Sequence, residues 1–237
     1  MNNQKVELLS PAGNLEKLKI AIKYGADAVY AGVSHFSLRI RAGKEFTFET
    51  FKEGIDYAHA RGKKVYATIN GFPFNSQIEL LKKHIATMAA LEPDGFIVAA
   101  PGVVKLCREI APQIDIHLST QANVLNYLDA QVFWDMGVKR IVVAREISLK
   151  DVMEIKKHLP DMEIEIFVHG SMCFAYSGRC LISAVQMGRV PNRGSCANDC
   201  RFEYTLYAGN DEHGSLFRLE EEPGVGTYIF NSKDMNL

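Results

Sequence analysis

Four cysteines fall within one stretch near the carboxyl end of the chain, and they have the clearest capacity for chemistry. Six residues separate Cys173 from Cys180, fifteen separate Cys180 from Cys196, and three separate Cys196 from Cys200. Four thiolates are the usual ligands of structural zinc or of an iron–sulfur cluster. Zinc modules favour cysteine pairs with two intervening residues, and no such pair occurs here. The spacing therefore favours an iron–sulfur cluster, with zinc second and plain thiols third.

The composition excludes several broad classes of protein. The 237 residues carry a formal net charge of −1, which excludes an overall basic excess of the kind that binds nucleic acid but leaves room for a local basic patch. The amino terminus lacks the pattern of a signal peptide, and no apolar run approaches the ~20 residues needed to span a membrane. We therefore expect a cytoplasmic protein whose thiols stay reduced. Cys107 lies in an amphipathic pattern and is expected to be a small buried side chain.

The elements that must position these residues alternate between strand and helix. The predicted strands are 6–11, 27–33, 63–70, 94–100, 114–120, 139–145 and 163–170. The predicted helices are 14–25, 46–62, 77–91, 103–111, 124–137 and 148–159. Three of these helices end in glycine (Gly25, Gly62 and Gly137), and Ser148 with Asp151 three residues later is a plausible N-cap. This alternation predicts parallel strands joined by helical crossovers, and seven such units favour a (β/α)8 TIM-like barrel over a doubly wound sheet.

The expected organisation is a barrel with one long insertion. Residues 1–170 form the first seven βα units, residues 171–226 form a cysteine-containing insertion, and residues 227–237 hold the last barrel strand. Within the insertion, 202–209 and 214–221 have the pattern of a small antiparallel hairpin. No helix follows the eighth strand, so the barrel is expected to be cut short at its carboxyl end. Loops after strands build the active site of such barrels, which places the insertion on the catalytic face.

Polar side chains at the ends of the predicted strands form a second set of candidates. The candidates for catalysis are Tyr30, Asn70, Arg145, Glu146 and His169. The candidates for substrate binding are Ser10, Arg39, Arg41, Ser119, Gln121, Asn123, Arg179, Arg193 and Arg201. Arginine suits carboxylates and phosphates, and the arginines of the insertion could follow a nucleic-acid backbone. For any single residue, a purely structural role such as capping the barrel is an equally good interpretation.

The stretch around the first two cysteines resembles the signature of peptidase family U32, the collagenase-like family. That signature has the form E-x-F-x2-G-[SA]-x-C-x4-to-6-G-x-C-x2-S. It is carried here by Glu165, Phe167, Gly170, Ser171, Cys173, Gly178, Cys180 and Ser183. The stretches "ELLSPAGNLEKLKIAIKYGADAVYAG", "FSLRIRA", "IHLSTQAN" and "PNRGSCANDCRFEY" also resemble the family, most closely a branch that hydroxylates tRNA.

The resemblance implies an activity, a cofactor and partners. Members of that branch make 5-hydroxyuridine at the wobble position of tRNA and require prephenate, a small dicarboxylate. Related members hydroxylate ribosomal RNA or ubiquinone precursors, and several carry iron–sulfur clusters. The resemblance therefore predicts a 4Fe–4S cluster on Cys173, Cys180, Cys196 and Cys200, with zinc as the alternative occupant. It also predicts that at least one of Arg39, Arg41 and Arg145 contacts the carboxylate of the small acid.

Two other functions remain open at this stage. The family has long been called a peptidase family, and a cysteine protease needs an activated thiol beside a histidine. His169 with Cys173 is the only local candidate, and neither a G-x-S-x-G nor an H-E-x-x-H motif occurs. The third possibility is a non-catalytic RNA-binding protein that holds structural zinc, and the identity of the metal would distinguish it.

Overall fold

A parallel sheet of seven strands, paired in the order of the chain, forms the main body of the protein. The computed structural model describes residues 6–33, 36–37, 46–171, 173, 175–189, 191, 196–205, 207–210, 215–218 and 234–235. The strands are β1 (Leu9–Pro11), β2 (Ala28–Ala31), β3 (Lys64–Ile69), β4 (Gly95–Val98), β5 (Asp115–Leu118), β6 (Arg140–Val142) and β7 (Glu163–Glu165). Each lies within one of the seven predicted runs, so the prediction of a parallel barrel-type sheet is confirmed.

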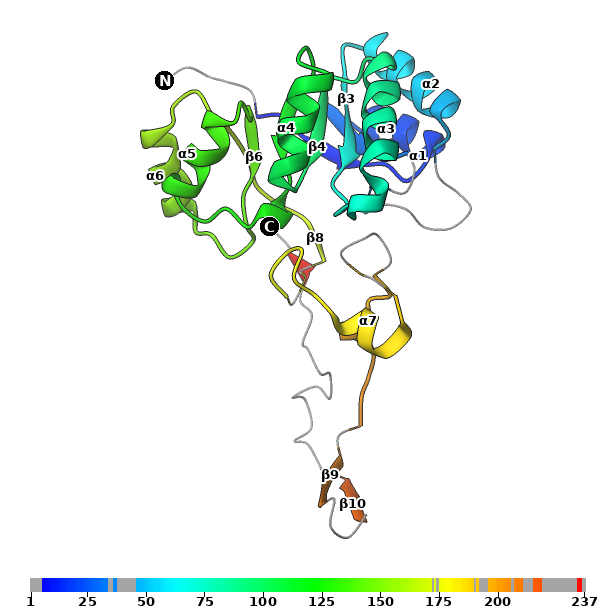
Figure 1. Cartoon of the computed structure of the whole chain (residues 1–237), viewed down its shortest axis with the longest axis vertical. Helices are drawn as coiled ribbons and strands as arrows, with labels where there is room; N and C mark the ends of the chain where they lie inside the picture. Colours follow the sequence, from blue (N-terminus) through cyan, green and yellow to red (C-terminus); the bar gives the residue numbers. More distant parts are fainter. Residues whose placement is uncertain are drawn as a thin grey trace.

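Six helices lie on the outside of the curled sheet (Figure 1). They are α1 (Leu15–Lys23), α2 (Phe48–His59), α3 (Ile78–Ala90), α4 (Pro101–Ile110), α5 (Tyr127–Asp135) and α6 (Leu149–His158). The side chain of Ser148 accepts a hydrogen bond from the backbone of Asp151, which confirms the predicted N-cap. Gly25, Gly62 and Gly137 all have positive φ, the conformation expected of a glycine that ends a helix.

The two faces of the sheet bury different side chains. The main core, which includes Val29, Phe96 and Ile141, lies between the sheet and the helices. Cys107 belongs to this core and is fully buried, as predicted, and burial raises the pKa of its thiol to about 12. The inner face carries a smaller apolar cluster centred on Tyr66. The hydroxyl of Tyr66 makes the concave side partly polar, and a buried polar group requires a hydrogen-bond partner.

Such partners lie around Arg140 at the amino-terminal end of the barrel interior. Its Nη1 lies 2.6 Å from Glu7 Oε1, and its Nη2 lies 2.6 Å from Glu163 Oε2. The hydroxyl of Tyr66 also donates to the Glu7 carboxylate, at 2.9 Å. Because β1 and β7 are the two edges of the sheet, the contact with Glu7 joins the first strand region to the last two strands. Ion pairs of Arg140 thus link the two edges of the sheet, β1 and β7, which are not neighbours in the strand order.

The carboxyl-terminal region forms a separate lobe next to the barrel. It contains β8 (Gly170–Ser171), α7 (Ile182–Met187), the short turn η4 (Asp199–Arg201) and β11 (Asp234–Met235). Strands β9 (Tyr207–Asn210) and β10 (Ser215–Arg218) pair antiparallel, which confirms the predicted hairpin, and this hairpin extends away from the sheet (Figure 1). In the part of the chain that the structure describes, no helix combines the length and hydrophobicity needed to cross a membrane.

The predicted eighth barrel strand has a different outcome where it is described. Asp234 and Met235 pair antiparallel with Ser171 and Gly170 in a two-stranded sheet, and not with the seven-stranded one. The rest of that segment, residues 227–233 and 236–237, lies outside the described residues. A parallel eighth strand within it stays a prediction.

Glu165 and His117 are ionisable groups held in the barrel interior. Burial raises the pKa of Glu165 to about 7 although Arg140 opposes the change, and Glu165 Oε2 has no hydrogen-bond partner. Burial also lowers the pKa of His117 to about 3. The ring of His117 lies edge-on to Tyr66, with the ring centroids 4.5 Å apart. Both environments favour the neutral form of the group.

A Glu165→Gln substitution tests this account of the interior. A carboxyl whose pKa is raised by folding stabilises the fold below its ordinary pKa, and this contribution is lost as the pH rises through the raised value. Wild-type protein should therefore lose roughly 2–3 kcal/mol of unfolding free energy relative to Glu165→Gln between about pH 5 and about pH 8. Urea denaturation across that range measures the difference. Glu79→Gln, on the surface of α3, is the control. If the difference in unfolding free energy between wild type and variant is independent of pH for both variants, the raised pKa of Glu165 is contradicted.

Candidate functional site

Hydrogen bonds connect several of the predicted site residues at the carboxyl ends of the strands. Ser119, buried after β5, donates a hydrogen bond from Oγ to Gln121 Oε1 at 2.9 Å. Gln121 Nε2 in turn donates to the backbone carbonyl of Asn70, which follows β3, at 3.2 Å. Three of the predicted site residues therefore meet across the mouth of the barrel. Each of these bonds also holds a loop in place, so the geometry serves structure as well as binding.

A buried hydroxyl pair lies behind this layer, and sequence reasoning did not identify it. Ser37 Oγ and Thr68 Oγ1 are 2.6 Å apart, and Thr68 also donates to the carbonyl of Ala31. A Cβ atom on Gly32 would lie 2.0 Å from Ser37 Oγ, so only glycine fits there. Glycine at the end of a predicted strand is the signal for such a close approach.

Asn123 and Arg145 follow the neighbouring strands β5 and β6. The backbone N–H of Ala144 donates to the carbonyl of Val124 at 3.0 Å, which joins the two segments that contain these residues. Asn123 has a left-handed conformation, with φ of 57°. Asn123 Oδ1 and Arg145 Nε are both buried without a hydrogen-bond partner. Unpaired buried polar atoms are rare in native structures and often mark functional sites.

Arg145 connects the barrel to the cysteine-bearing loop. Its Nη2 donates to Ser177 Oγ at 2.6 Å and to the carbonyl of Ala175 at 3.3 Å. Ser177 is buried, and Gly178 beside it packs so closely that an added Cβ would lie 3.2 Å from the carbonyl oxygen of Gln121. Ser177 was not among the predicted site residues. The Ser-Gly turn pattern between the two cysteines was the available signal.

A hydrogen bond within the lobe joins the segment after Cys180 to the segment that contains Cys196 and Cys200. Ser183, buried in α7, accepts a hydrogen bond at Oγ from the backbone of Ala197 at 3.1 Å. The backbone of Asn198 donates to Cys196 Sγ at 3.4 Å. Asp199 is buried, and neither of its carboxylate oxygens has a hydrogen-bond partner. Asp199 was not among the predicted site residues.

Cys200 lies close enough to the other three clustered thiols for them to affect its pKa. Burial raises the pKa of Cys200, Arg201 lowers it, and the thiolates of Cys173, Cys196 and Cys180 raise it further. Among the described residues, however, no group of three or more His, Cys, Asp or Glu side chains has the arrangement of a metal site. Four soft donors and a buried carboxylate without a partner suit a cationic centre chemically. The donor set fits a metal or cluster, and the 4Fe–4S assignment stays a prediction.

The other predicted residues are scattered around the site. Glu146 and His169 are exposed, and Tyr30 packs against the inner cluster around Tyr66. Ser10 pairs in register with Val29, whose side chain belongs to the core on the helix side, so Ser10 faces away from the barrel interior. Arg179 is exposed and Arg201 half-buried, both on the lobe.

Three predicted residues lie outside the described part of the chain: Arg39, Arg41 and Arg193. Arg145 Nη2 donates to the cysteine-bearing loop, and Arg145 Nε is buried without a hydrogen-bond partner. Its predicted contact with a small carboxylate stays a prediction.

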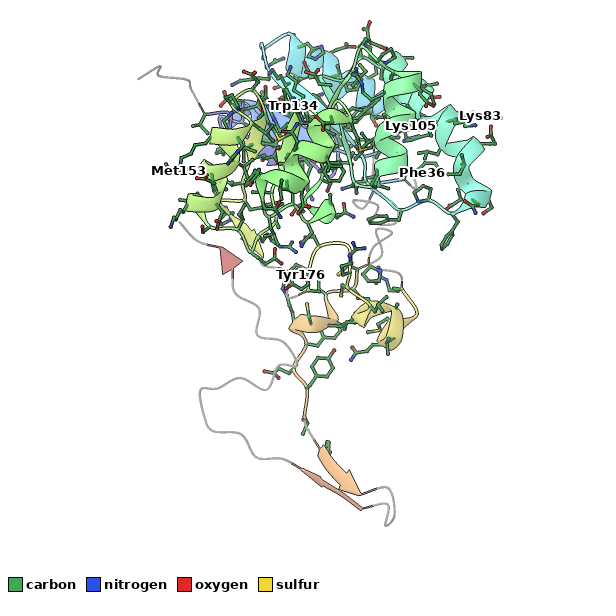
Figure 2. The ribbon with its side chains drawn as sticks, turned by 60° about the vertical axis from the view of Figure 1, so that its left-hand side comes forward. Phe36, Lys83, Lys105, Trp134, Met153 and Tyr176 are labelled. Atoms are coloured by element: carbon green, nitrogen blue, oxygen red, sulfur yellow. The ribbon has the colours of Figure 1, made fainter. Side chains whose placement is uncertain are left out.

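An apolar groove with a volume of about 460 Å³ lies between α3 and α4. Phe72, Ile78, Val103 and Leu106 line it, with Lys105 among the polar groups. Figure 2 shows Lys105 on the outer helical layer. The groove shares Phe72 with the contact around Gly178, whose added Cβ would lie 3.5 Å from that ring. It adjoins the mouth, but none of the clustered thiols lines it.

The curled parallel sheet, with a cysteine-bearing loop fastened to the carboxyl ends of its strands, defines an α/β barrel protein. The sequence model of peptidase family U32 matches residues 13–237. The chain belongs to that family, which confirms the resemblance found in the sequence.

Known relatives divide between RNA modification and peptidase names. The protein named tRNA hydroxylation protein P of Helicobacter pylori (strain ATCC 700392 / 26695) is 77% identical over 233 residues, which cover 98% of this chain and 55% of that protein. The 23S rRNA 5-hydroxycytidine C2501 synthase of Escherichia coli (strain K12) is 35% identical over 221 residues, which cover 93% of this chain and 32% of that enzyme. The chain thus spans about half the length of tRNA hydroxylation protein P. It spans a smaller share of the 23S rRNA enzyme.

A solved structure described as the U32 peptidase Mk0906 has the same fold. It superposes with a TM-score of 0.64 at 16% sequence identity, covering 98% of this chain and 90% of that one. At this identity the likeness establishes the fold alone.

Removing the guanidinium of Arg145 should release the cysteine loop. An Arg145→Met variant keeps most of the apolar stem but loses both donors to residues 175 and 177. Hydrogen bonds from charged groups contribute about 1.5–3 kcal/mol, so amide exchange in 175–179 should accelerate by about tenfold or more. Hydrogen–deuterium exchange followed by mass spectrometry measures this, with Arg108→Met on α4 as the control. Unchanged exchange in that segment would mean that Arg145 does not hold the loop.

Proposed function

We propose that this chain forms part of an RNA hydroxylase that converts the wobble uridine of tRNA to 5-hydroxyuridine. The single observation that carries the proposal is the position of the thiols. The loop that contains Cys173 and Cys180 is fastened by Arg145 to the carboxyl ends of the barrel strands, where barrel enzymes carry out their chemistry. Relatives named for hydroxylation of tRNA and rRNA support the same reaction class.

The proposed chemistry explains why thiols are needed at this place. Replacing the C5 hydrogen of a pyrimidine by hydroxyl removes two electrons from the ring, so a co-reactant that delivers oxygen and accepts these electrons is required, and a redox centre can relay the electrons. Acidic and basic side chains alone do not carry electrons. Cys173, Cys180, Cys196 and Cys200 would hold an iron–sulfur cluster, which supplies one-electron redox chemistry when bound. The family resemblance adds prephenate as a required small acid.

The remaining residues of the mouth would bind and orient the substrate. Asn123 Oδ1 offers an acceptor and Arg145 Nε a donor, in the segments that follow the neighbouring strands β5 and β6. An imide edge such as that of uracil presents a donor next to an acceptor. Both atoms are buried, so a base would reach them only after the neighbouring loop shifts. Arg179 and Arg201 on the lobe would contact the phosphate backbone.

A peptidase activity has weaker support from the described residues. Nucleophilic catalysis needs a thiol within hydrogen-bond reach of a base. Among the described side chains, no hydrogen bond joins Cys173 to His169, and His169 is exposed. A non-catalytic zinc protein would use the same four ligands, so metal identity separates that alternative from the hydroxylase.

The loss of one modified nucleoside in a deletion strain tests the proposed reaction. A strain without the gene should lose 5-hydroxyuridine and its derivatives from bulk tRNA, as measured by mass spectrometry of digested nucleosides. The whole gene should restore them. A gene with Cys173→Ala should fail, because the proposed redox centre loses a ligand, whereas Cys107→Ala in α4 should succeed.

The peptidase alternative makes the opposite prediction. Unchanged tRNA nucleosides in the deletion strain, together with Cys173-dependent cleavage of gelatin by the purified protein, would overturn the hydroxylase proposal.

A further inference from the structure

A single tight turn separates Cys173 from Cys180 and is built from residues 176–179. The backbone N–H of Arg179 donates to the carbonyl of Tyr176 at 3.1 Å, which is the hydrogen bond that closes a β-turn. Gly178 occupies the third position with φ of +75°, a conformation that strongly favours glycine. In such a turn, the Cα atoms of the first and fourth residues lie within about 7 Å. The side chains of Tyr176 and Arg179 therefore start close together.

The middle of this turn is fixed to the barrel. Ser177 is only 7% exposed and receives the 2.6 Å hydrogen bond from Arg145. Gly178 packs against Gln121 and Phe72, and an added Cβ would lie 3.2 Å from the carbonyl oxygen of Gln121 and 3.5 Å from the Phe72 ring. Contacts with Arg145 and Gln121, which follow the neighbouring strands β6 and β5, thus hold the turn in one orientation. A surface loop without such contacts would sample many orientations and lose entropy on binding.

The ends of the turn carry two side chains without internal partners. The side chain of Tyr176 is 59% exposed, and Arg179 is exposed as well. Within the described part of the chain, neither side chain makes a hydrogen bond, an ion pair or a ring contact. Elsewhere in the protein, a tyrosine and an arginine cover each other: the guanidinium carbon of Arg61 lies 3.6 Å from the ring centroid of Tyr57. Figure 2 shows Tyr176 at the junction between the barrel and the lobe that carries α7.

An aromatic face and a guanidinium held close together match one chemical unit. Bases of single-stranded nucleic acid stack on aromatic side chains, and arginine contacts the adjoining phosphate. A paired base presents no free face to such a ring, so the unit selects unpaired nucleotides. We propose that the 176–179 turn holds one unpaired nucleotide of the RNA substrate, with its base stacked on Tyr176 and its phosphate on Arg179. The proposal deepens the hydroxylase function and rests on RNA being the substrate.

Equilibrium binding of two RNA probes tests this role. The probes are an unmodified tRNA transcript and a fully paired RNA duplex, titrated with the chain in a fluorescence-anisotropy assay. Tyr176→Ala should weaken tRNA binding at least about fivefold, the lower bound for losing one stacked base, and should leave duplex binding unchanged. Tyr176→Phe should bind like the wild type, because it keeps the ring. Tyr24→Ala, which removes an exposed tyrosine from the end of α1, is the matched control.

The contribution of Arg179 has its own measurable signature. Arg179→Gln should reduce the slope of log affinity against log salt concentration by about 0.7, the value for one contact with a single-stranded phosphate. The proposal is overturned if Tyr176→Ala binds tRNA as tightly as Tyr24→Ala, if Tyr176→Phe is as weak as Tyr176→Ala, or if the duplex loses equal affinity. It is also overturned if Tyr176 governs binding of gelatin and not of tRNA.

These outcomes separate the proposal from the function on which it rests. If the deletion strain loses 5-hydroxyuridine but Tyr176→Ala binds tRNA normally, the hydroxylase function stands and the nucleotide-binding turn fails. If the deletion strain keeps the nucleoside while Tyr176 still governs tRNA binding, the turn binds RNA and the proposed reaction fails.

Discussion

The hydrogen bond from Arg145 to Ser177 connects the two parts of the molecule that the proposed chemistry needs. On one side lies a rigid parallel sheet whose strand ends carry Ser119 and Gln121, and on the other lies a lobe with four thiols. At 2.6 Å, with Ser177 buried, this bond is a charge-assisted contact shielded from water. The close packing of Gly178 against Gln121 reinforces it. Without these contacts, the loop that carries Cys173 and Cys180 would have no fixed position relative to the strand ends.

The barrel divides its polar residues between two ends with different tasks. At the amino-terminal end, Arg140 forms ion pairs with Glu7 and Glu163 that join the edges of the sheet, although the nearby Glu165 Oε2 has no hydrogen-bond partner. At the carboxyl end, Asn123 and Arg145 keep buried atoms without partners. A satisfied network stabilises a structure, whereas unmet hydrogen-bonding capacity is typical of a binding site. This contrast follows the usual division of labour in α/β barrels, where stability lies at the bottom and chemistry at the top.

Periodicity along the sequence predicted the strands and helices well, because local patterning and capping decide them. Ser148 and the glycines after the helices marked boundaries that the structure confirms. Long-range partners were harder to predict. Arg140 reaches Glu7 across 133 positions of sequence, and nothing in a strand pattern identifies that pairing. The direction of a strand side chain was also hard to predict. Ser10 lies at the end of a correctly predicted strand, but the pairing register places its side chain on the helix side of the sheet. Ser177 was missed because its role depends on a partner from a different strand.

We propose that the four clustered cysteines hold a redox-active iron–sulfur centre above the barrel. Iron, acid-labile sulfide and zinc measured per chain after anaerobic purification test it most directly. The account predicts about four iron and four sulfide in the wild type and in Cys107→Ala, the values for a 4Fe–4S cluster. Alanine at any one of Cys173, Cys180, Cys196 or Cys200 should abolish iron binding. One zinc per chain without iron, or full iron retention in two of these single variants, would contradict the account.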